Sequence, residues 1–289
     1  MTTEIVIQTI VSGLLMGAIY ALVASGLTLI FGLMEIVNFA HGEFLMIAMY
    51  TAFWSYVLVG LDPLFSLPFV MLVLFALGAA TYYGIIRNIL HASVLVQITA
   101  TFGLAVFLRS LAQFLWTPDF RSIEDPIVEG RIAIADVFLG LPQIVASVGC
   151  ILAFAALYWF VNRTEIGLAL QATAQDKEAA SLMGIHTDRM YALGWGVGSA
   201  CVGVAGCLIA NYYYIFPEVG LTFALLAFVA VAMGGFGSLV GALLAGILIG
   251  LVEALGGLFA PVPAYKYVII FLLYLGIVLV RPLGMFGRY

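Results

Sequence analysis

Charged residues are scarce in this chain of 289 residues, since only 9% are Asp, Glu, Lys or Arg. An ordinary soluble domain carries about 25% charged residues. Hydrophobic residues make up 65% of the sequence, and the mean hydropathy is +1.20. A water-soluble globule of this composition would expose large apolar patches and aggregate. The composition therefore excludes that class and predicts a protein embedded in lipid.

Lysine is almost absent, and this excludes one common nucleotide site. Phosphate-binding loops of the G-x-x-x-x-G-K-[ST] type need a lysine that follows a glycine. The chain has only Lys177 and Lys266, and neither follows a glycine. Ten basic residues against fifteen acidic ones also leave no basic face for nucleic acid. We therefore expect no ATP site of this kind in the chain, and no nucleic-acid partner.

Clustered metal ligands and nucleophiles are missing as well. The three cysteines, Cys150, Cys201 and Cys207, lie within apolar runs, and their spacing is not that of a metal site. We expect them to be small core residues. The three histidines are dispersed along the chain. The sequence thus predicts no metal, no catalytic residue and no cofactor of the chain's own.

The N-terminal region lacks any basic residue before Arg87. A secretory signal peptide needs a positively charged segment ahead of its apolar core. We therefore expect the first apolar stretch to remain in the protein as a membrane helix.

Long charge-free runs are what the chain has in abundance. A spanning helix needs about 20 apolar residues. Runs of about this length or longer, the last one shorter, cover residues 5–34, 44–61, 63–86, 88–108, 137–162, 191–217, 219–252 and 267–280. The run 219–252 would measure about 51 Å as one helix and overshoot the bilayer, so we expect a break at Gly234-Gly235-Phe236-Gly237. The sequence predicts an all-α, polytopic bundle of about eight membrane segments, one or two of them broken or re-entrant, in a single domain 1–289.

The distribution of basic residues sets the expected orientation, because short loops rich in Lys and Arg stay cytoplasmic. Arg87, the loop 163–190 and the tail with Arg281 and Arg288 are predicted to be cytoplasmic. The acidic loop 117–136 is predicted to be external. Counting segments back places the N-terminus outside, unless a re-entrant segment near Asn38 reverses it.

The largest predicted cytoplasmic loop contains a helix-forming stretch. Residues 169–183 are rich in Ala, Gln and Glu, and Gly184 suits a left-handed cap at the end of one helix. Leu168, Ala172, Ala179 and Leu182 recur at roughly helical spacing and form a small apolar face. On this pattern alone, a docking surface and a solvated interfacial helix remain equally open.

Polar groups within the apolar runs are costly in lipid and default to functional hypotheses. Two groups of residues precede predicted helices, and we interpret them either as lining a translocation pathway or as hydrogen-bonding the interrupted backbone. The first group is Asn38, His41, Gly42 and Glu43, and the second is Gly234, Gly235, Gly237 and Ser238. A weak internal repeat would relate them. Arg109 either reaches the outer interface or contacts a carboxylate of the cargo, and Glu253 is interpreted as interfacial.

Two motifs resemble a known class of transporter. Glu178-Ala179-Ala180, followed three residues later by Gly184, resembles the coupling loop of permease subunits of bacterial ABC importers. The segment 32–44, with Asn38-Phe-Ala-His-Gly-Glu43, closely resembles the branched-chain amino acid permease family, and the C-terminal pattern from Met233 to Gly287 agrees. The resemblance covers nearly the whole chain. Departures are Leu168 and Gln171 where the family often has arginines, and Arg109 where it often has glutamine, which leaves the cargo open.

The resemblance implies a subunit of an importer that works by alternating access. A second related permease chain, two ATPase subunits that hold ATP and Mg, and a periplasmic binding protein would complete it in the bacterial inner membrane. The ATPase would be contacted through Gln171, Gln175, Asp176, Lys177, Glu178, Ala179, Ala180, Gly184 and Ile185. Branched-chain or other neutral amino acids are the implied cargo, with urea, amides or small organic acids as alternatives.

Two other classes remain as rivals. A stand-alone secondary transporter would need its own ion relay, and Glu35 and Glu43 are the only acids deep in the first third of the chain. A membrane-embedded enzyme would need a clustered nucleophile or metal set, which the sequence does not show.

Overall fold

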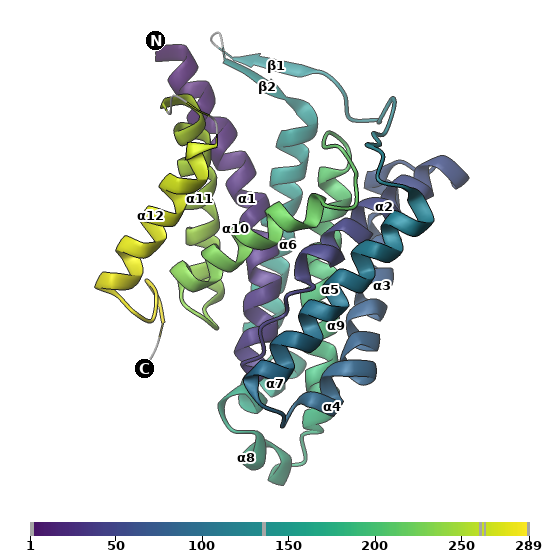
Figure 1. Ribbon diagram of the computed structural model, residues 1–289, viewed down its shortest axis with the longest axis vertical. Coiled ribbons are helices and arrows are strands. Elements are labelled where there is room, and N and C mark those ends of the chain that lie inside the picture. Colours follow the sequence, from purple (N-terminus) through teal and green to yellow (C-terminus); the bar gives the residue numbers. More distant parts are fainter. Residues whose placement is uncertain (1–2, 135–136, 260–261, 263, 288–289) are drawn as a thin grey trace.

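The computed structural model describes residues 3–134, 137–259, 262 and 264–287. Asp136 of the predicted external loop and Arg288 of the predicted tail lie outside these residues. The chain forms a helical bundle with one small sheet (Figure 1). Its elements, in order, are α1 (Thr3–Met34), α2 (His41–Val59), α3 (Pro63–Thr81), η1 (Tyr82–Ile86), α4 (Arg87–Ile89), α5 (Val94–Trp116), β1 (Arg131–Ile134), β2 (Val137–Gly140), α6 (Leu141–Arg163), α7 (Glu165–Gln175), α8 (Lys177–Leu182), α9 (Thr187–Ile209), α10 (Val219–Gly234), α11 (Leu239–Phe259) and α12 (Tyr265–Val280).

Within the described residues, seven helices are long and apolar enough to cross a membrane. They are α1, α2, α3 with its continuation to Ile89, α5, α6, α9 and α11, and the shorter apolar helices α10 and α12 join them. The predicted polytopic helix bundle is confirmed. The predicted break of the 219–252 run is also confirmed, because α10 ends at Gly234 and α11 begins at Leu239.

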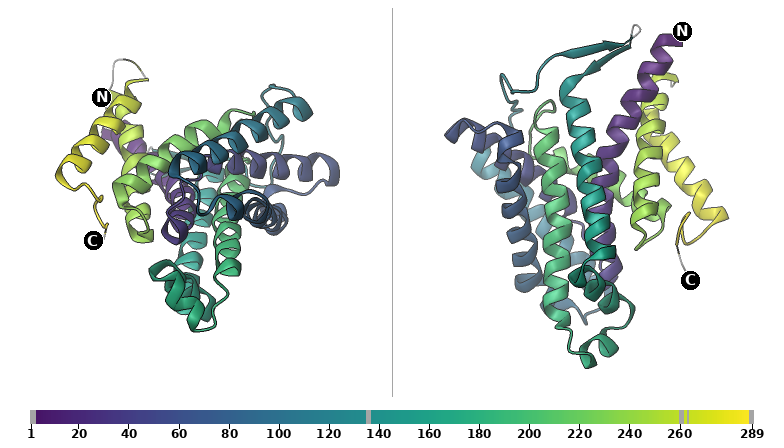
Figure 2. Two further views of the ribbon diagram at one scale, coloured as in Figure 1. Left: turned by 60° about the horizontal axis from the view of Figure 1, so that its bottom comes forward. Right: turned by 180° about the vertical axis from the view of Figure 1, so that it is seen from behind.

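The centre of the bundle is built on α1 and α9, the two most buried spans. Small residues allow this packing: a Cβ added to Gly17 would lie 2.7 Å from Cα of Ile247 on α11, so only glycine permits the helices to approach this closely. Gly26 of α1 packs in the same way against Gly198 of α9. Helices α1, α6 and α9 lie side by side (Figure 2).

The bundle has two distinct ends. The N-terminus and the two strands lie at one end, and α4 and α8 lie at the other (Figure 1). The predicted cytoplasmic Arg87 and loop 163–190 therefore share an end, opposite the predicted external loop. Helix α1 begins at the end of the bundle that holds the predicted external loop, and the two ends are called external and cytoplasmic below after this predicted orientation.

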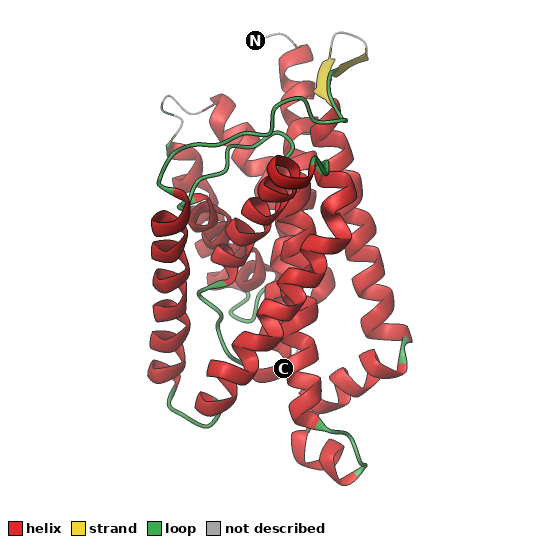
Figure 3. Cartoon of the chain, turned by 90° about the vertical axis from the view of Figure 1, so that its right-hand side faces the viewer, coloured by secondary structure: helices red, strands yellow, loops and turns green. Residues whose placement is uncertain are grey.

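The external end contains structure that the sequence analysis did not predict. Strands β1 and β2 pair antiparallel, from Arg131 opposite Gly140 to Ile134 opposite Val137 (Figure 3). The sequence analysis did not predict this short hairpin, whose residues are mostly apolar or β-branched, but the fold remains the predicted helix bundle. Arg121 and Ile215 exchange two backbone hydrogen bonds of 2.9 and 2.8 Å, which tie the two longest external connections together.

The turn between α2 and α3 shows how sequence sets these ends. Gly60 ends α2 in the left-handed conformation, with φ of 70°. Asp62 caps α3, because its Oδ1 accepts a hydrogen bond of 2.9 Å from Leu64 N, and Pro63 occupies the first turn. Oδ2 of Asp62 accepts another bond of 2.8 Å from Ile127 N in the external loop. One carboxylate thus fixes both a helix start and the loop above it.

Candidate functional site: two helix breaks and a cytoplasmic coupling segment

The first helix break lies deep in the bundle. Nε2 of His41, the first residue of α2, is 2.9 Å from the carbonyl oxygen of Val23 on α1. Val23 precedes the end of α1 at Met34 by eleven residues, or roughly 16 Å at helical rise. Residues 35–40 therefore run back into the bundle before α2 begins. Helix α2 starts at mid-depth and ends at the external end.

Two helix N-termini converge at this depth. A Cβ added to Gly42 would overlap the carbonyl oxygen of Gly220, and one added to Gly220 would overlap that of Gly42. The first turns of α2 and α10 are thus in backbone contact. A helix N-terminus carries partial positive charge and unpaired N–H groups, so their convergence attracts negative charge.

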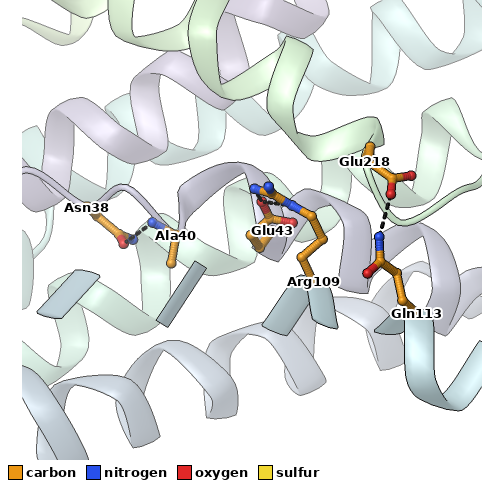
Figure 4. A network of polar contacts seen from close by, with 6 residues as sticks. All are labelled: Asn38, Ala40, Glu43, Arg109, Gln113 and Glu218. Atoms are coloured by element: carbon orange, nitrogen blue, oxygen red, sulfur yellow. Dashed lines mark hydrogen bonds and ion pairs between the residues drawn. The ribbon is translucent and has the colours of Figure 1, made fainter. Parts of the chain in front are cut away.

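The chain supplies that negative charge itself (Figure 4). Glu43 lies in the first turn of α2, is 2% exposed, and accepts a bond of 3.1 Å from Nε of Arg109 on α5, with a second, shorter contact to Nη2. Glu218 precedes α10 and accepts a bond of 2.5 Å from Nε2 of Gln113. Figure 4 shows the Glu43–Arg109 pair and the Glu218–Gln113 pair in one region, so this region carries one net negative charge when all three charged groups are ionised.

The position of Arg109 contradicts one of the two interpretations that the sequence offered. The sequence analysis placed it either at the outer interface or on a cargo carboxylate. The structure instead pairs it with Glu43 inside the bundle, so the interface interpretation is wrong. An unpaired charge at this depth would be costly, and the carboxylate of Glu43 compensates the guanidinium. Contact with the cargo stays a prediction.

Several polar atoms at the first break are buried and lack a protein partner among the described residues. They are Nδ2 of Asn38, Nδ1 of His41 and Oε2 of Glu43. Oδ1 of Asn38 accepts a bond of 3.1 Å from Ala40 N, so its carbonyl side closes the turn while its amide donors remain free. Buried polar groups are usually hydrogen-bonded, and such a cluster is suited to water or a polar ligand.

The second break is built differently. Gly235 and Gly237 have φ of 103° and 79°, a region open to glycine but strained for other residues. The last carbonyls of α10 are satisfied by the C-terminal tail, because Met285 N donates to Met233 O at 2.9 Å and Phe286 N donates to Gly234 O at 3.0 Å. Ser238 Oγ accepts a bond from Gly241 N at 3.1 Å and starts α11.

The two breaks lie at opposite ends of α10 rather than in one cluster. Gly42 meets the first turn of α10, and the ring of Phe39 packs on Phe228 at its middle, with centroids 5.2 Å apart. A Cβ added to Gly32, near the end of α1, would lie 3.2 Å from Cα of Gly237. The predicted pathway residues thus form two groups joined by α10.

The predicted coupling segment, residues 163–190, contains the two helices α7 and α8, so the prediction of one helix over 169–183 is wrong. Helix α7 ends at Gln175, and Asp176 then takes an extended backbone conformation with φ of −154°. Its Oδ1 accepts bonds of 2.9 and 3.0 Å from Glu178 N and Ala179 N, which caps α8. Aspartate competes for backbone donors in this way, and this capping interrupts the helix despite its favourable composition.

The end of α8 agrees with the sequence analysis. Gly184 has φ of 84°, and Ile185 N donates to Ala180 O at 3.1 Å, which satisfies the last turn. Leu182 and Met183 are 87% and 83% exposed, so an apolar tip projects from the cytoplasmic end.

The predicted ATPase contacts differ in exposure. Gln175, Asp176, Glu178, Ala179 and Gly184 are exposed, and Lys177 and Ile185 are partly buried. Ala180 is buried. Gln171 points back into the protein, where its Nε2 donates to Val161 O at 2.7 Å.

A cavity of about 400 Å³ lies between the predicted coupling segment and the second break. Gln171 and Ala174 of α7 line one wall, and Gly237 and Ser238 line another. Thr28 of α1 also lines it, and its buried Oγ1 has no protein partner among the described residues.

A second linkage runs from α8 to the cytoplasmic end of α3. Nζ of Lys177 lies 5.6 Å from the ring centroid of Tyr191 on α9, and that ring packs edge-on against Tyr82. The Tyr82 hydroxyl donates to Oδ1 of Asp188 at 2.7 Å, and Nε of Arg87 lies 3.2 Å from the same oxygen. These contacts connect α8 to α9 and, through Tyr82, to η1, which continues α3.

Sequence reasoning missed Gln113, Glu218 and the tail residues Met285 and Phe286. Gln113 lies four residues after Arg109, hence on the same helix face, and this spacing was a usable signal. Glu218 marks the boundary of the apolar run that starts at Val219. Among the described residues, no group of three or more His, Cys, Asp or Glu side chains is placed to hold a metal ion.

Comparison of the sequence with known proteins identifies a family. Residues 9–278 match the family described as branched-chain amino acid transport system, permease component. The high-affinity branched-chain amino acid transport system permease protein BraD of Pseudomonas aeruginosa is 32% identical over 98% of this chain and 96% of its own length. The corresponding permease protein LivH of Escherichia coli is 31% identical over the same shares.

Another relative is named for a different cargo. The galactofuranose transporter permease protein YtfT of Escherichia coli is 30% identical over 61% of this chain and 51% of its own length. No solved structure matches the chain. The full-length similarity and the helix-rich, membrane-spanning fold agree, and the chain belongs to the family of branched-chain amino acid transport permease components.

Proposed function

We propose that this chain is the membrane permease of an ATP-driven importer for branched-chain or other neutral amino acids. The observation that carries the proposal is the similarity over almost the whole chain to permeases whose names state this transport. The chain supplies the path and the coupling segment, and it does not hydrolyse ATP. ATP and Mg are held by two ATPase subunits, and a second related permease chain and a periplasmic binding protein complete the assembly in the bacterial inner membrane.

The path runs by the convergence of α2 and α10. The unpartnered Asn38 amide, the His41 ring and Glu43 offer hydrogen bonds to a passing polar group. The net negative charge of the Glu43, Glu218 and Arg109 cluster favours the ammonium of an amino acid over a free anion. Backbone contact between Gly42 and Gly220 makes the site sensitive to any shift of α10.

Helices α7 and α8 transmit the motion of the ATPase subunits to the helix bundle. The exposed Leu182 and Met183 enter a cleft of the ATPase, with the charges of Asp176 and Glu178 at its rim. Closure of the ATPase dimer on ATP moves α8 and α7, and this movement changes the width of the cavity between Gln171 of α7 and Ser238 of the second break. Because α10 joins the two breaks, movement at its cytoplasmic end changes the contact at its other end.

The test is ATP hydrolysis by the co-purified complex in lipid, with its binding protein, across a panel of ligands. Stimulation by leucine, isoleucine or valine is the expected result. Stimulation by urea, an amide or an organic acid would keep the importer mechanism and change the cargo. Absence of any co-purifying ATPase would overturn the proposal in favour of a stand-alone transporter.

A further inference from the structure

A second cavity, of about 390 Å³, lies away from both breaks. Helices α1, α10, α11 and α12 line it together with Tyr213, which follows α9. The first turns of α10 form part of its wall through Thr222 and Phe223, and Phe223 lies three residues after Gly220, on the face of the helix that contacts Gly42. The cavity therefore adjoins the proposed path. It includes the last turns of α11 and the first turn of α12, which lie toward the external end (Figure 1).

An ion pair lines this cavity. Nζ of Lys266 lies 2.6 Å from Oε1 of Glu253, and the Tyr20 hydroxyl donates to Oε2 of Glu253 at 2.6 Å. The two charged side chains are only 28% and 14% exposed. The sequence analysis took Glu253 for an interfacial residue, but both its oxygens are engaged inside the wall of the cavity. Charges in a membrane bundle are costly and commonly mark substrate pathways.

Aromatic rings form the rest of the wall. Phe223 packs against Tyr20 on one side and Tyr213 on the other, with both pairs of centroids 5.7 Å apart. Tyr267 also lines the cavity, and Nζ of Lys266 lies 5.0 Å from its ring centroid. The cavity thus combines an ammonium, a carboxylate and an apolar aromatic surface within one space.

We propose that this cavity is an entry site that binds a free aliphatic amino acid before it reaches the convergence of α2 and α10. The ligand carboxylate binds the two remaining donors of Lys266, its ammonium binds the free lone pairs of Glu253, and its side chain packs on the aromatic rings. The proposal rests on the proposed function and deepens it. A phosphatidylethanolamine head group carries a similar pair of charges, and the test separates the two sources.

The test uses a cysteine reporter in the complete transporter. In Thr222→Cys the new thiol lies in the cavity wall, while the native Cys150, Cys201 and Cys207 are buried. Labelling by a small membrane-impermeant maleimide is followed in vesicles with and without phosphatidylethanolamine. The expected result is that millimolar leucine slows labelling at least fivefold in both vesicle types. Ser122→Cys, in the exposed external loop, is the control whose labelling leucine leaves unchanged.

Charge variants separate ligand binding from a structural ion pair. Lys266→Gln should abolish leucine protection of the Thr222→Cys thiol, and Lys266→Arg should retain part of it. The double exchange of Glu253→Lys with Lys266→Glu preserves the ion pair but reverses its direction, so protection should remain lost although the complex assembles. Full protection in the exchanged variant would assign the pair to structure alone and overturn the proposal.

Two further outcomes also overturn it. Protection by phosphatidylethanolamine without any effect of leucine would assign the cavity to a lipid head group. Stimulated ATP hydrolysis by leucine, with no protection in any vesicle, would leave the proposed function standing while removing this site. Failure of the proposed function is read separately, from the ligand panel of the hydrolysis assay.

Discussion

The two helix breaks solve the same problem in opposite ways. The first break, which comprises residues 35–40 and the first turn of α2, brings polar side chains into the bundle and leaves three of their buried atoms without a protein partner among the described residues. Residues 235–238 use glycine at positive φ, and their neighbouring carbonyls are satisfied by backbone of the tail. The first break therefore retains unpaired hydrogen-bonding groups that can bind a transported molecule. At the second break, the backbone carbonyls are already bonded to the protein's own tail. We infer that the first break serves the cargo and that the second serves as a joint.

Removing the buried charge at the first break should have the largest effect. Glu43→Ala leaves Arg109 without its partner, and breaking a buried ion pair costs about 3–5 kcal/mol. We expect uptake to fall at least a hundredfold, with less complex recovered from the membrane. The measurement is radiolabelled amino-acid uptake per assembled complex.

The double variant Glu43→Ala with Arg109→Ala separates stability from transport. It removes both charges, so assembly should recover substantially. Uptake should stay low because the polar path is gone. Restoration of full uptake by the double variant would show that the pair serves packing alone, and the contrast between the two breaks would lose its functional meaning.

Changing the second break should have a smaller effect, on stability rather than on selectivity. Gly235→Ala places a Cβ 2.5 Å from Gly287 N and forces an unfavourable φ, which costs about 1–3 kcal/mol. We expect a lower midpoint of thermal unfolding with an unchanged order of preferred ligands. Gly276→Ala, in α12 with no heavy atom within 4 Å of its added Cβ, is the matched control and should not lower the midpoint. A changed ligand order in Gly235→Ala would contradict the assignment as a joint.

Variants in the predicted coupling segment should have the smallest effect on transport. They test whether α8 transmits motion to the second break. Asp176→Ala removes the cap of α8 and should cost about 1 kcal/mol, whereas Asp176→Asn keeps an acceptor at the cap. If the capped geometry matters, uptake per ATP hydrolysed falls in Asp176→Ala and is largely retained in Asp176→Asn.

Glu178→Lys changes the charge without touching the cap, and it should reduce uptake per ATP through the ATPase contact. Equal uptake per ATP in Glu178→Lys and the wild type would argue against the proposed docking of α8.

Sequence reasoning reached the helices because their length and apolarity are local properties. It predicted a break from length, since 34 charge-free residues in one helix exceed the bilayer thickness, and it located the break at the glycines from Gly234 to Gly237. It failed where the outcome depends on a distant partner. The pairing of Arg109 with Glu43 joins residues 66 positions apart, and no local pattern specifies it. The extra helix end at Asp176 was locally readable, because aspartate followed by good helix formers is a typical N-cap.

The external hairpin was missed for another reason. The predicted acidic loop was assigned by charge, which sets its side of the membrane but not its conformation. Its alternating Arg131-Ile-Ala-Ile134 stretch carries too few residues for a reliable strand signal. At the candidate site, the sequence identified Asn38, His41 and Glu43 as polar groups at a break, whereas Gln113 and Glu218 became visible only through the fold.

The hydrogen bonds from Met285 and Phe286 to the last carbonyls of α10 have a consequence for biosynthesis. Those carbonyls enter the membrane about fifty residues before their partners are made, which at roughly 5–20 residues per second is a delay of about 3–10 s. During that interval the nascent chain holds an unfinished helix end that only water, lipid head groups or a chaperone can satisfy. The order of translation thus makes closure of this joint one of the last steps in maturation of the subunit.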